Sequence, residues 1–223
     1  MILADTFAWS TFPDAIHFIG DNPGLLWDKS LQQLGLSIAA LAIGVAIALP
    51  LGVVLGHFHK GSFIAISVAN LGRALPSLVL IAFGLLIFGI GFWNNAAALI
   101  VLAVPPILTN AYFAVDTIDH SVVEAARGMG MRGREILLRV ELPLAVPLIF
   151  AGIRIGAVFV VATATIAAIA GGGGLGQIIV DQASYRLSGV VAASLCVSLL
   201  AFAVAGLLTL TRKVLSRPFV SAD

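Results

Sequence analysis

The ionisable side chains that could carry chemistry are concentrated in one stretch of this 223-residue sequence, residues 124–143, which holds four arginines and three glutamates. Immediately before it, Asp119 has the side chain and the position of a helix N-cap. Ser121 and Glu124 have the spacing of a capping box, in which each side chain accepts a hydrogen bond from the other residue's backbone N–H. The stretch is therefore predicted to begin with a short, capped, polar helix.

A glycine turn divides the charged stretch. Gly128 and Gly130 allow a bend that residues with a Cβ resist. Beyond the bend, Glu135 and Arg139 lie one turn apart on a second helix, and Pro143 opens the next apolar run. The stretch predicts two short helices around a turn, a pattern that is also typical of an ordinary amphipathic helix-turn-helix on a membrane surface.

Two smaller motifs suggest chemistry that the rest of the sequence does not support. His57 and His59 have an i, i+2 spacing in a turn, which is weak evidence for a metal site and better fits solvated histidines at a membrane interface. Gly171, Gly173 and Gly176 satisfy the dinucleotide-binding expression, but the βαβ context that it requires is missing. The sequence has no Gly-Lys-Ser/Thr triplet, so it lacks a phosphate-binding loop of the ATPase kind.

The composition indicates an integral membrane protein. The chain is 60% hydrophobic and 10% charged, with a mean hydropathy of +1.10, whereas soluble domains have about 25% charged residues. The net charge is +1, and no basic run with interleaved aromatics suggests a nucleic-acid partner. Cys196 is the single cysteine, which excludes a disulfide framework and a thiolate metal cluster within the chain.

Five apolar segments have the length to cross a bilayer, and they are residues 34–55, 62–91, 96–115, 144–170 and 190–210. The first carries no charge and measures about 33 Å as a helix, against a hydrocarbon core of about 30 Å. Pro76 disfavours helix at Leu75, so the second segment is predicted to be a broken helix. The third is expected to be broken by Pro105 and Pro106.

The N-terminal segment is predicted to lie outside the cytoplasm. Residues 1–30 carry four aspartates against Lys29 alone, and they lack the basic start and the unbroken apolar core of a signal peptide. We expect an extracytoplasmic arm in which Trp9 and Trp27 anchor at the membrane interface. Residues 93–95, Trp-Asn-Asn, predict a polar turn with an aromatic at the interface after the second span.

Lysine and arginine counts give the orientation, because cytoplasmic loops are enriched in both. With the charged stretch inside, eight basic residues are cytoplasmic, namely Lys60, Arg127, Arg132, Arg134, Arg139, Arg212, Lys213 and Arg217. Lys29 and Arg186 are outside. The prediction is an all-α polytopic membrane protein with five transmembrane helices, N-terminus out and C-terminus in. Residues 31–211 form the membrane domain, which includes the charged segment 116–143, and residues 212–223 form a cytoplasmic tail.

At the charged segment the chain resembles the permeases of ABC importers. The matching pattern is a Glu-Ala-Ala triplet, a glycine six residues after the Glu and a Leu-Pro pair twelve residues further on. It falls on Glu124, Ala125, Ala126, Gly130, Leu142 and Pro143. One position departs, because Val140 stands where the family usually has Ile. The resemblance implies the type I ABC importer permease fold, and it implies that this segment, with Gly128 and Arg134, docks on an ATP-binding subunit and couples its motion to the membrane helices.

The resemblance also implies the rest of the assembly. Two ATP-binding subunits hold ATP and Mg²⁺, so this chain is expected to bind no cofactor and to be a transport subunit rather than an enzyme. A second copy of the permease, or a paralogue, completes the pathway, and an extracytoplasmic binding protein delivers the solute. The expected location is the bacterial cytoplasmic membrane, with many passes through the lipid bilayer.

Further segments are similar to permeases of the osmoprotectant class, and they are residues 74–78, 106–112, 124–131, 139–147, 152–154 and 163–165 with the glycine run that follows. Two positions depart from that class: His120 replaces a proline, and Arg73 stands where an uncharged polar residue is common. The implied cargo is glycine betaine, choline, carnitine or a related quaternary amine. A D-methionine or other amino-acid-type permease shares the five-helix plan and is the alternative.

Candidate residues of the translocation pathway or its gate are Pro76, Ser77, Asn110, Tyr112, Thr163, Thr165, Gly171, Gly172, Gly173 and Gly174. The glycine run is expected to turn sharply at the outer mouth, where a gate would close, although a simple helix-terminating loop has the same pattern. The hydroxyl and amide side chains are explained equally well by hydrogen bonds between helices.

Two arginines lie within or beside predicted spans. Arg73 lies at the cytoplasmic face before a helix that begins at Pro76, or it points into the bundle interior, and we prefer a broken helix that lines the pathway. Arg154 is expected to brace the structure near the cytoplasmic side, because a fixed cation would repel a quaternary amine. Its expected partner is a helix C-terminus, Asp116 or a backbone carbonyl.

Two other classes of function remain as rivals. A membrane-embedded hydrolase or lipid transferase would need convergent catalytic groups, and the five predicted spans contain no His, Asp or Glu. A passive channel would differ from an importer because its transport would not depend on ATP.

Overall fold

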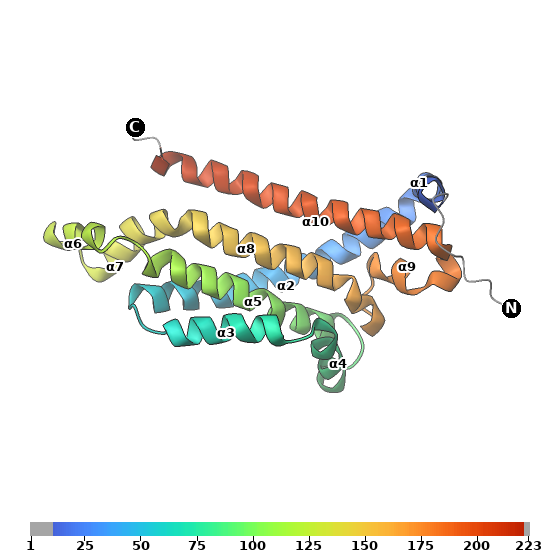
Figure 1. The fold of residues 1–223 in the computed structure, drawn as a ribbon, viewed down its shortest axis with the longest axis horizontal. Helices are drawn as coiled ribbons and strands as arrows, with labels where there is room; N and C mark the ends of the chain where they lie inside the picture. The colour runs from blue at the N-terminus through green and yellow to red at the C-terminus, as the bar shows by residue number, and fades with distance from the viewer. Residues whose placement is uncertain (1–10, 221–223) are drawn as a thin grey trace. The chain divides into compact units, whose positions relative to one another are not determined.

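The computed structural model describes residues 11–220, without the side chains of residue 73 and residues 213–220, and all regular structure in this part of the chain is helical (Figure 1). The α-helices are α1 Thr11–Asp21, α2 Pro23–His57, α3 Ser62–Ala74, α4 Ser77–Phe88, α5 Phe92–Asp116, α6 His120–Gly128, α7 Gly133–Ile136, α8 Leu142–Ala164, α9 Gly176–Val180 and α10 Gln182–Val220. A π-helical segment, Leu137–Glu141, joins α7 to α8, and a 3-10 helix, Ile166–Ala170, follows α8. The all-α prediction is confirmed, while Trp9 lies outside the described residues.

Four helical stretches in the described part of the chain have the length and apolar composition of a membrane span, and they are Pro23–His57, Phe92–Asp116, Gly133–Ala164 and Gln182–Arg212. A fifth is obtained when α3 and α4 are counted together as one broken span. The break lies at Leu75, whose backbone is extended (φ −80°, ψ 116°) because the following Pro76 disfavours a helical conformation there. The predicted broken helix is confirmed, and the described part of the chain has four or five candidate spans.

The prediction that Pro105 and Pro106 break the third span is wrong, because α5 continues through both residues. Each proline removes one backbone donor, but a helix in hydrocarbon keeps its other hydrogen bonds because no water competes for them. The Thr109 hydroxyl donates to the Pro105 carbonyl at 2.7 Å, and the Asn110 amide donates to the Pro106 carbonyl at 2.7 Å. These side chains add hydrogen bonds to the turn that follows the prolines.

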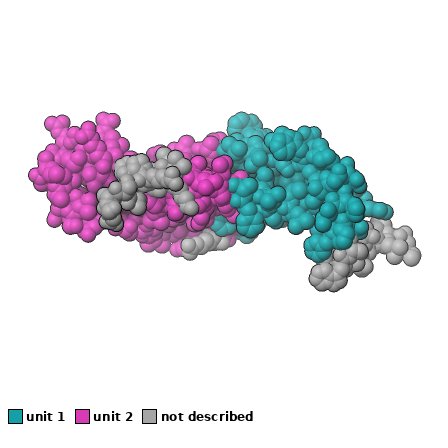
Figure 2. Space-filling model, turned by 90° about the horizontal axis from the view of Figure 1, so that it is seen from above, with its two compact units in different colours: residues 1–40, 76–99, 159–203 teal, residues 41–75, 100–158, 204–223 magenta. Residues whose placement is uncertain are grey.

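The chain forms two compact units, which Figure 2 colours separately. Unit 1 consists of residues 1–40, 76–99 and 159–203, and unit 2 consists of residues 41–75, 100–158 and 204–223. The core of unit 1 contains Leu26, Leu175, Ile178 and Ala193. The core of unit 2 joins α2, α5 and α8 and contains Val53, Ala111, Ala114, Val115, Ala145 and Ile149.

Close approach of helices within unit 2 depends on residues that lack a side chain. A Cβ at Gly52 of α2 would lie 2.6 Å from the carbonyl oxygen of Leu108 on α5. A Cβ at Gly72 of α3 would lie 2.4 Å from Cγ of Pro105 on the same α5. Because van der Waals contact is a main source of helix association in a bilayer, small residues at these contacts stabilise the unit.

Residues 93–95 do not form the expected polar turn. They lie in the first turn of α5, where Trp93 is exposed but Asn94 and Asn95 are buried, at 1% and 0% exposure. The Asn95 amide donates to the carbonyl oxygen of Ala170 at 3.2 Å. Carbonyl groups at a helix end have no partner within the helix. The Asn95 side chain supplies that partner to the carbonyl of Ala170, at the end of the 3-10 helix, and this explains why a polar side chain is buried here.

Gly52→Ala is expected to destabilise the folded chain by about 1–3 kcal/mol, the usual cost of overpacking, because the added methyl group would overlap the backbone of α5. Denaturant unfolding of the purified protein in detergent micelles measures this change. Gly35→Ala on the same helix is the control, since no atom lies within 4 Å of the added Cβ and alanine favours a helix over glycine by about 0.5–1 kcal/mol. Equal unfolding free energies for the two variants would contradict the packing argument.

Candidate functional site

The first helix of the charged segment is capped by a side chain, as predicted. Asp119 precedes α6, and its Oδ1 accepts a hydrogen bond from the backbone N–H of Ser121 at 2.9 Å. This bond favours the ionised carboxylate and lowers the pKa of Asp119. The predicted capping box is wrong, because Ser121 is the second residue of α6 rather than its cap. Glu124 is exposed beside His120, with 3.5 Å between Oε1 and Nε2.

The turn after α6 is a Schellman motif, which satisfies two carbonyl groups that the helix end leaves free. The N–H of Met131 donates to the carbonyl of Ala126 at 3.2 Å, and the N–H of Gly130 donates to that of Arg127 at 2.9 Å. Gly130 has a φ of +83°, a left-handed conformation that favours glycine. The glycine turn is therefore confirmed at Gly130, whereas Gly128 is the last residue of α6.

A small apolar cluster joins the two halves of the charged segment. It consists of Val123, Ala126 and Ile136, with Ile118, Met131 and Val140 packed against it. Within the Glu-Ala-Ala triplet, Ala126 faces this cluster, and Glu124 and Ala125 are exposed. The segment is a compact unit that presents the first two residues of the triplet on its surface.

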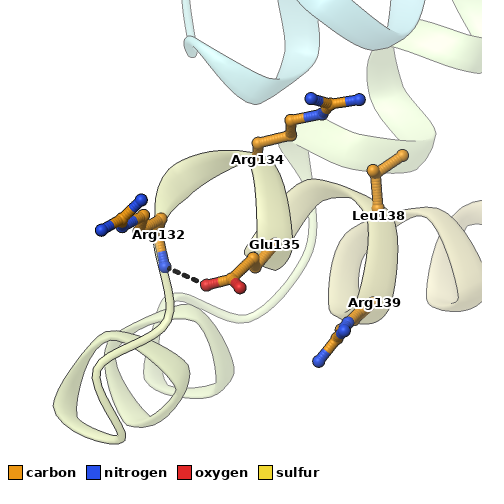
Figure 3. Close-up of a pocket in the computed structure, with 5 residues that line it drawn as sticks. All are labelled: Arg132, Arg134, Glu135, Leu138 and Arg139. Carbon is orange, nitrogen blue, oxygen red and sulfur yellow. Dashed lines mark hydrogen bonds between the residues drawn. The ribbon is translucent and has the colours of Figure 1, made fainter.

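The second half of the segment carries a basic hollow of about 360 Å³ (Figure 3). Its lining residues are Arg132, Arg134, Glu135, Leu138 and Arg139. Glu135 Oε2 accepts a hydrogen bond from the backbone N–H of Arg132 at 2.9 Å, which fixes the start of α7. The hollow is thus lined by three arginines and by one carboxylate that is already hydrogen-bonded, and it suits an anionic group.

Glu135 and Arg139 both line the hollow, but they do not lie on one α-helix as predicted. Glu135 belongs to the four-residue α7, and Arg139 belongs to the π-helical segment Leu137–Glu141. Leu142 and Pro143 follow at the start of α8 and are half-buried, and Leu142 packs against the core of unit 2. The apolar end of the predicted motif therefore anchors the segment to the membrane helices.

Two histidines at the C-terminal end of α2, His57 and His59, contact carboxylates at both ends of the charged segment. His57 Nδ1 lies 2.5 Å from Glu141 Oε2, and the two side chains are 16% and 4% exposed. His59 Nδ1 lies 2.9 Å from Asp116 Oδ1, and these side chains are 49% and 25% exposed. The prediction of a solvated histidine is wrong for His57, because a carboxylate far along the chain shields it from water.

The glycine run after α8 is a tight loop that two glutamines of α2 hold in place. Positive φ angles of 75°, 70° and 74° occur at Gly171, Gly173 and Gly174. Gln32 Oε1 accepts from the N–H of Gly174 at 3.2 Å, and Gln33 Oε1 accepts from the N–H of Leu175 at 3.1 Å. The expected sharp turn is confirmed, and the backbone N–H groups of Gly174 and Leu175 are satisfied by side chains.

Gln33 is the buried member of this pair, at 1% exposure. Its Nε2 donates to the carbonyl of Val161 at 3.0 Å and to the hydroxyl of Thr165 at 3.2 Å. Gln33 thus joins α2, the end of α8 and the glycine loop, and it links Thr165 to that loop. Sequence reasoning missed Gln33, although a glutamine among the apolar residues of 31–36 was an available signal, since a buried amide needs partners.

The other candidate pathway residues make local contacts. Asn110 donates to a carbonyl of its own helix, Tyr112 is 2% exposed, and Thr163 is half-buried. Pro76 is exposed and precedes α4, which begins at Ser77. The Asn110 bond lies within α5 and is therefore not the hydrogen bond between helices that the alternative interpretation expected, so the pathway role of these residues stays a prediction.

Arg154 has a partner that the sequence did not suggest. Its Nη1 donates to Thr209 Oγ1 of α10 at 3.4 Å, rather than to one of the three expected partners, a helix C-terminus, Asp116 or a backbone carbonyl. Thr209 in turn donates to the carbonyl of Ala205 at 2.8 Å, so its hydroxyl is free to accept. This contact braces α8 against α10. The side chain of Arg73 lies outside the described residues.

Comparisons with known proteins agree with this architecture. Residues 44–216 match the family model described as "Binding-protein-dependent transport system inner membrane component". The chain is 34% identical over 197 residues to the glycine betaine/carnitine/choline transport system permease protein OpuCB of Bacillus subtilis (strain 168), which covers 88% of this chain and 91% of that protein. It is 37% identical over 181 residues to the choline transport system permease protein OpuBB of the same organism, with 79% and 83% covered.

Among solved structures, the chain is similar to the MetNI methionine ABC transporter in an inward-facing conformation. The TM-score is 0.75 at 24% sequence identity, and the match covers 87% of this chain and 98% of that chain. This likeness concerns the fold, and it agrees with the fold that the sequence predicted.

Gln33→Leu is expected to speed hydrogen exchange of the backbone amides in the glycine loop by about tenfold or more, because a buried N–H without a partner costs about 1–3 kcal/mol. Exchange followed by mass spectrometry on peptides that cover residues 165–180 measures the effect. Gln32→Leu is the matched control: it removes one bond to the same loop from an exposed position. A loop that exchanges equally fast in both variants would show that the buried amide does not hold it.

Proposed function

Because the chain belongs to the family of binding-protein-dependent transport system inner membrane components, we propose that it forms the translocation pathway of an ABC importer for glycine betaine, choline, carnitine or a related quaternary amine. It is a permease subunit of the bacterial cytoplasmic membrane. Two relatives that are 34% and 37% identical to it are named as permeases for these solutes. Amino-acid cargo has weaker support, since the likeness to the methionine transporter is one of fold at 24% identity.

The observation that carries the proposal is the compact, charged segment with its exposed Glu124 and Ala125. The segment continues into the membrane, because Gly133–Ala164 is one helical stretch with the composition of a span. A partner that displaces residues 116–143 therefore also displaces α8. Two ATP-binding subunits dock here and hold ATP and Mg²⁺, and their closure and reopening drive alternating access by rigid-body movement.

The chain crosses the membrane five times, with the N-terminus outside. This assignment counts α3 and α4 as one span. It is supported by the eight lysines and arginines on the side of the charged segment, against two on the other side. A second copy of the chain or a paralogous permease completes the pathway.

The cargo is recognised mainly by an extracytoplasmic binding protein. A quaternary ammonium is held well by an aromatic cage through cation–π attraction, and aromatic residues make up 8% of this chain. Arg154 pairs with a hydroxyl on α10 and leaves its positive charge uncompensated by that contact. Such a cation suits bracing between helices better than contact with a cationic solute.

The glycine loop, Gln33 and Thr165 form the outer gate of the pathway. Support comes from the three positive φ angles of the loop and from the glutamine side chains that hold its backbone. A loop held by a few side-chain hydrogen bonds changes conformation at a lower cost than a helix, in which each residue adds a backbone bond.

Gly130→Asp is expected to leave membrane insertion intact and to uncouple transport from ATP hydrolysis, because the turn needs the left-handed conformation at this position. The measurement is ATP-dependent uptake of radiolabelled choline into proteoliposomes that contain the complete importer and its binding protein. Gly24→Asp adds the same charge to an exposed helical position outside residues 116–143, with open space around it, and it serves as the control. Normal coupled transport by Gly130→Asp would contradict the coupling role, and wild-type uptake without ATP would indicate a passive channel.

Arg134→Glu is expected to weaken binding of the ATP-binding subunits by about fivefold, since an exposed ion pair contributes about 0.2–1 kcal/mol. The physical reason is that the basic hollow receives acidic side chains of the partner. Titration of the ATPase onto the permease in nanodiscs at two salt concentrations measures both the affinity and its ionic-strength dependence. Lys60→Glu changes an exposed cytoplasmic charge that does not line the hollow, and an equal loss there would refute a specific role for the hollow.

A further inference from the structure

We infer that His57 and Glu141 are a positioning pair that links the charged segment to α2, so that the segment moves the first long helix as well as α8. The inference rests on the proposed coupling role of residues 116–143. It assigns a transmission role to two side chains outside the Glu-Ala-Ala surface, 84 positions apart in the sequence.

The pair lies at the C-terminal end of the charged segment, where the segment meets the membrane helices. His57 is the last residue of α2, and Glu141 is the last residue of the π-helical segment before α8. Nδ1 and Oε2 are 2.5 Å apart. On the other side of the imidazole, a Cβ at Gly133 would lie 3.7 Å from Nε2. The ring is therefore held between the start of α7 and the carboxylate that ends the π segment.

Burial distinguishes this pair from an ordinary surface contact. Exposed ion pairs contribute little, because water screens them and the side chains must be ordered. The side chain of Glu141 is 4% exposed, and a buried carboxylate needs a partner to remain there. His57 supplies that partner, so the position of Glu141 depends on α2.

The π-helical segment adds a second observation. π-helical turns are uncommon, and they often occur at functional sites because they alter the direction in which side chains point. Here the π turn lies between the charged segment and the membrane helix, and its last residue is Glu141, which is 3% exposed. This turn therefore places the Glu141 carboxylate beside the end of α2.

Apolar contacts also link α2 to the π-helical segment, so that α2 follows when this segment is displaced. Val53 belongs to the core of unit 2, against which Leu137 and Leu142 pack from either side of the π turn. Gly56 lies so close to α5 that a Cβ there would be 2.7 Å from the Tyr112 carbonyl oxygen. A displacement of the π turn is thus transmitted to the end of α2, and from there to α5.

The chain also offers a matched control at the other end of the segment. His59 and Asp116 form the same kind of contact at 2.9 Å, but their side chains are 49% and 25% exposed. If burial gives the first pair its role, loss of the second pair has little effect.

The test measures choline imported per ATP hydrolysed by the complete importer with its binding protein in proteoliposomes. His57→Leu and Glu141→Leu are each expected to lower this ratio by about tenfold, the effect of losing a buried charge-assisted hydrogen bond. His57→Asn retains an N–H donor near the Nδ1 position and Glu141→Gln retains an acceptor, so both should keep the ratio within about twofold of wild type. His59→Leu should also keep it.

The double variant His57→Leu/Glu141→Leu separates positioning from folding. It removes both polar groups, so the complex should regain the thermal stability that the single leucine variants lose, while the ratio stays low. A ratio that recovers together with stability would overturn the inference. So would single variants that assemble with the ATPase and couple normally. ATP-dependent uptake by the wild-type importer, measured in parallel, tests the proposed function independently of these variants.

Discussion

A polar group that is removed from water must find its partner inside the protein, and in a bilayer this requirement leaves few conformations for the chain. Long helices meet it along most of the described sequence. Where helix stops, amide side chains replace the helical hydrogen bonds: Gln32 and Gln33 bind the glycine loop, and Asn95 binds the end of the 3-10 helix. Exceptions among the described residues are both amide atoms of Asn94, the Oδ1 of Asn95 and the hydroxyl of Ser37, which are buried without a hydrogen-bond partner.

The same requirement explains why the two ends of the charged segment differ. Its exposed helix, α6, uses short-range solutions, with a capping aspartate at one end and a glycine turn at the other. Its C-terminal end lies against the membrane helices, and there Glu141 needs a partner from another part of the chain. Such a segment, with local contacts around α6 and long-range contacts at Glu141, is suited to receive force at one end and transmit it at the other.

Features that depend on neighbouring residues could be predicted from the sequence. The Asp119 cap, the turn at Gly130 and the break before Pro76 each follow from the chemistry of a few adjacent residues. The predicted capping box failed because the helix is capped two positions earlier, at Asp119, and the same pattern fits more than one helix start. The predicted helix break at Pro105 and Pro106 was wrong, because propensities measured in water overstate the effect of proline in hydrocarbon, where the rest of the helix is retained.

Partners distant in the sequence could not be predicted in this way. Nothing near His57 indicates that a carboxylate of the charged segment buries it, and nothing near Gln33 indicates that Leu175 donates to it. The buried Asn95 was taken for a turn residue because its acceptor, Ala170, follows 75 positions later. The charged segment was accessible to sequence reasoning because its contacts are local, whereas the contacts of the glycine loop and of Glu141 depend on tertiary structure.

The local character of those contacts has a consequence for assembly. The cap, the turn and the apolar cluster of residues 118–140 are all formed within the segment itself. Contacts between residues close in sequence form quickly, so this segment can fold before the later helices are in place. A binding surface that is already ordered loses little conformational entropy when a partner arrives. Association of the proposed ATP-binding subunit with this segment can then proceed as rigid docking. Such docking can be fast and reversible, because no folding accompanies binding.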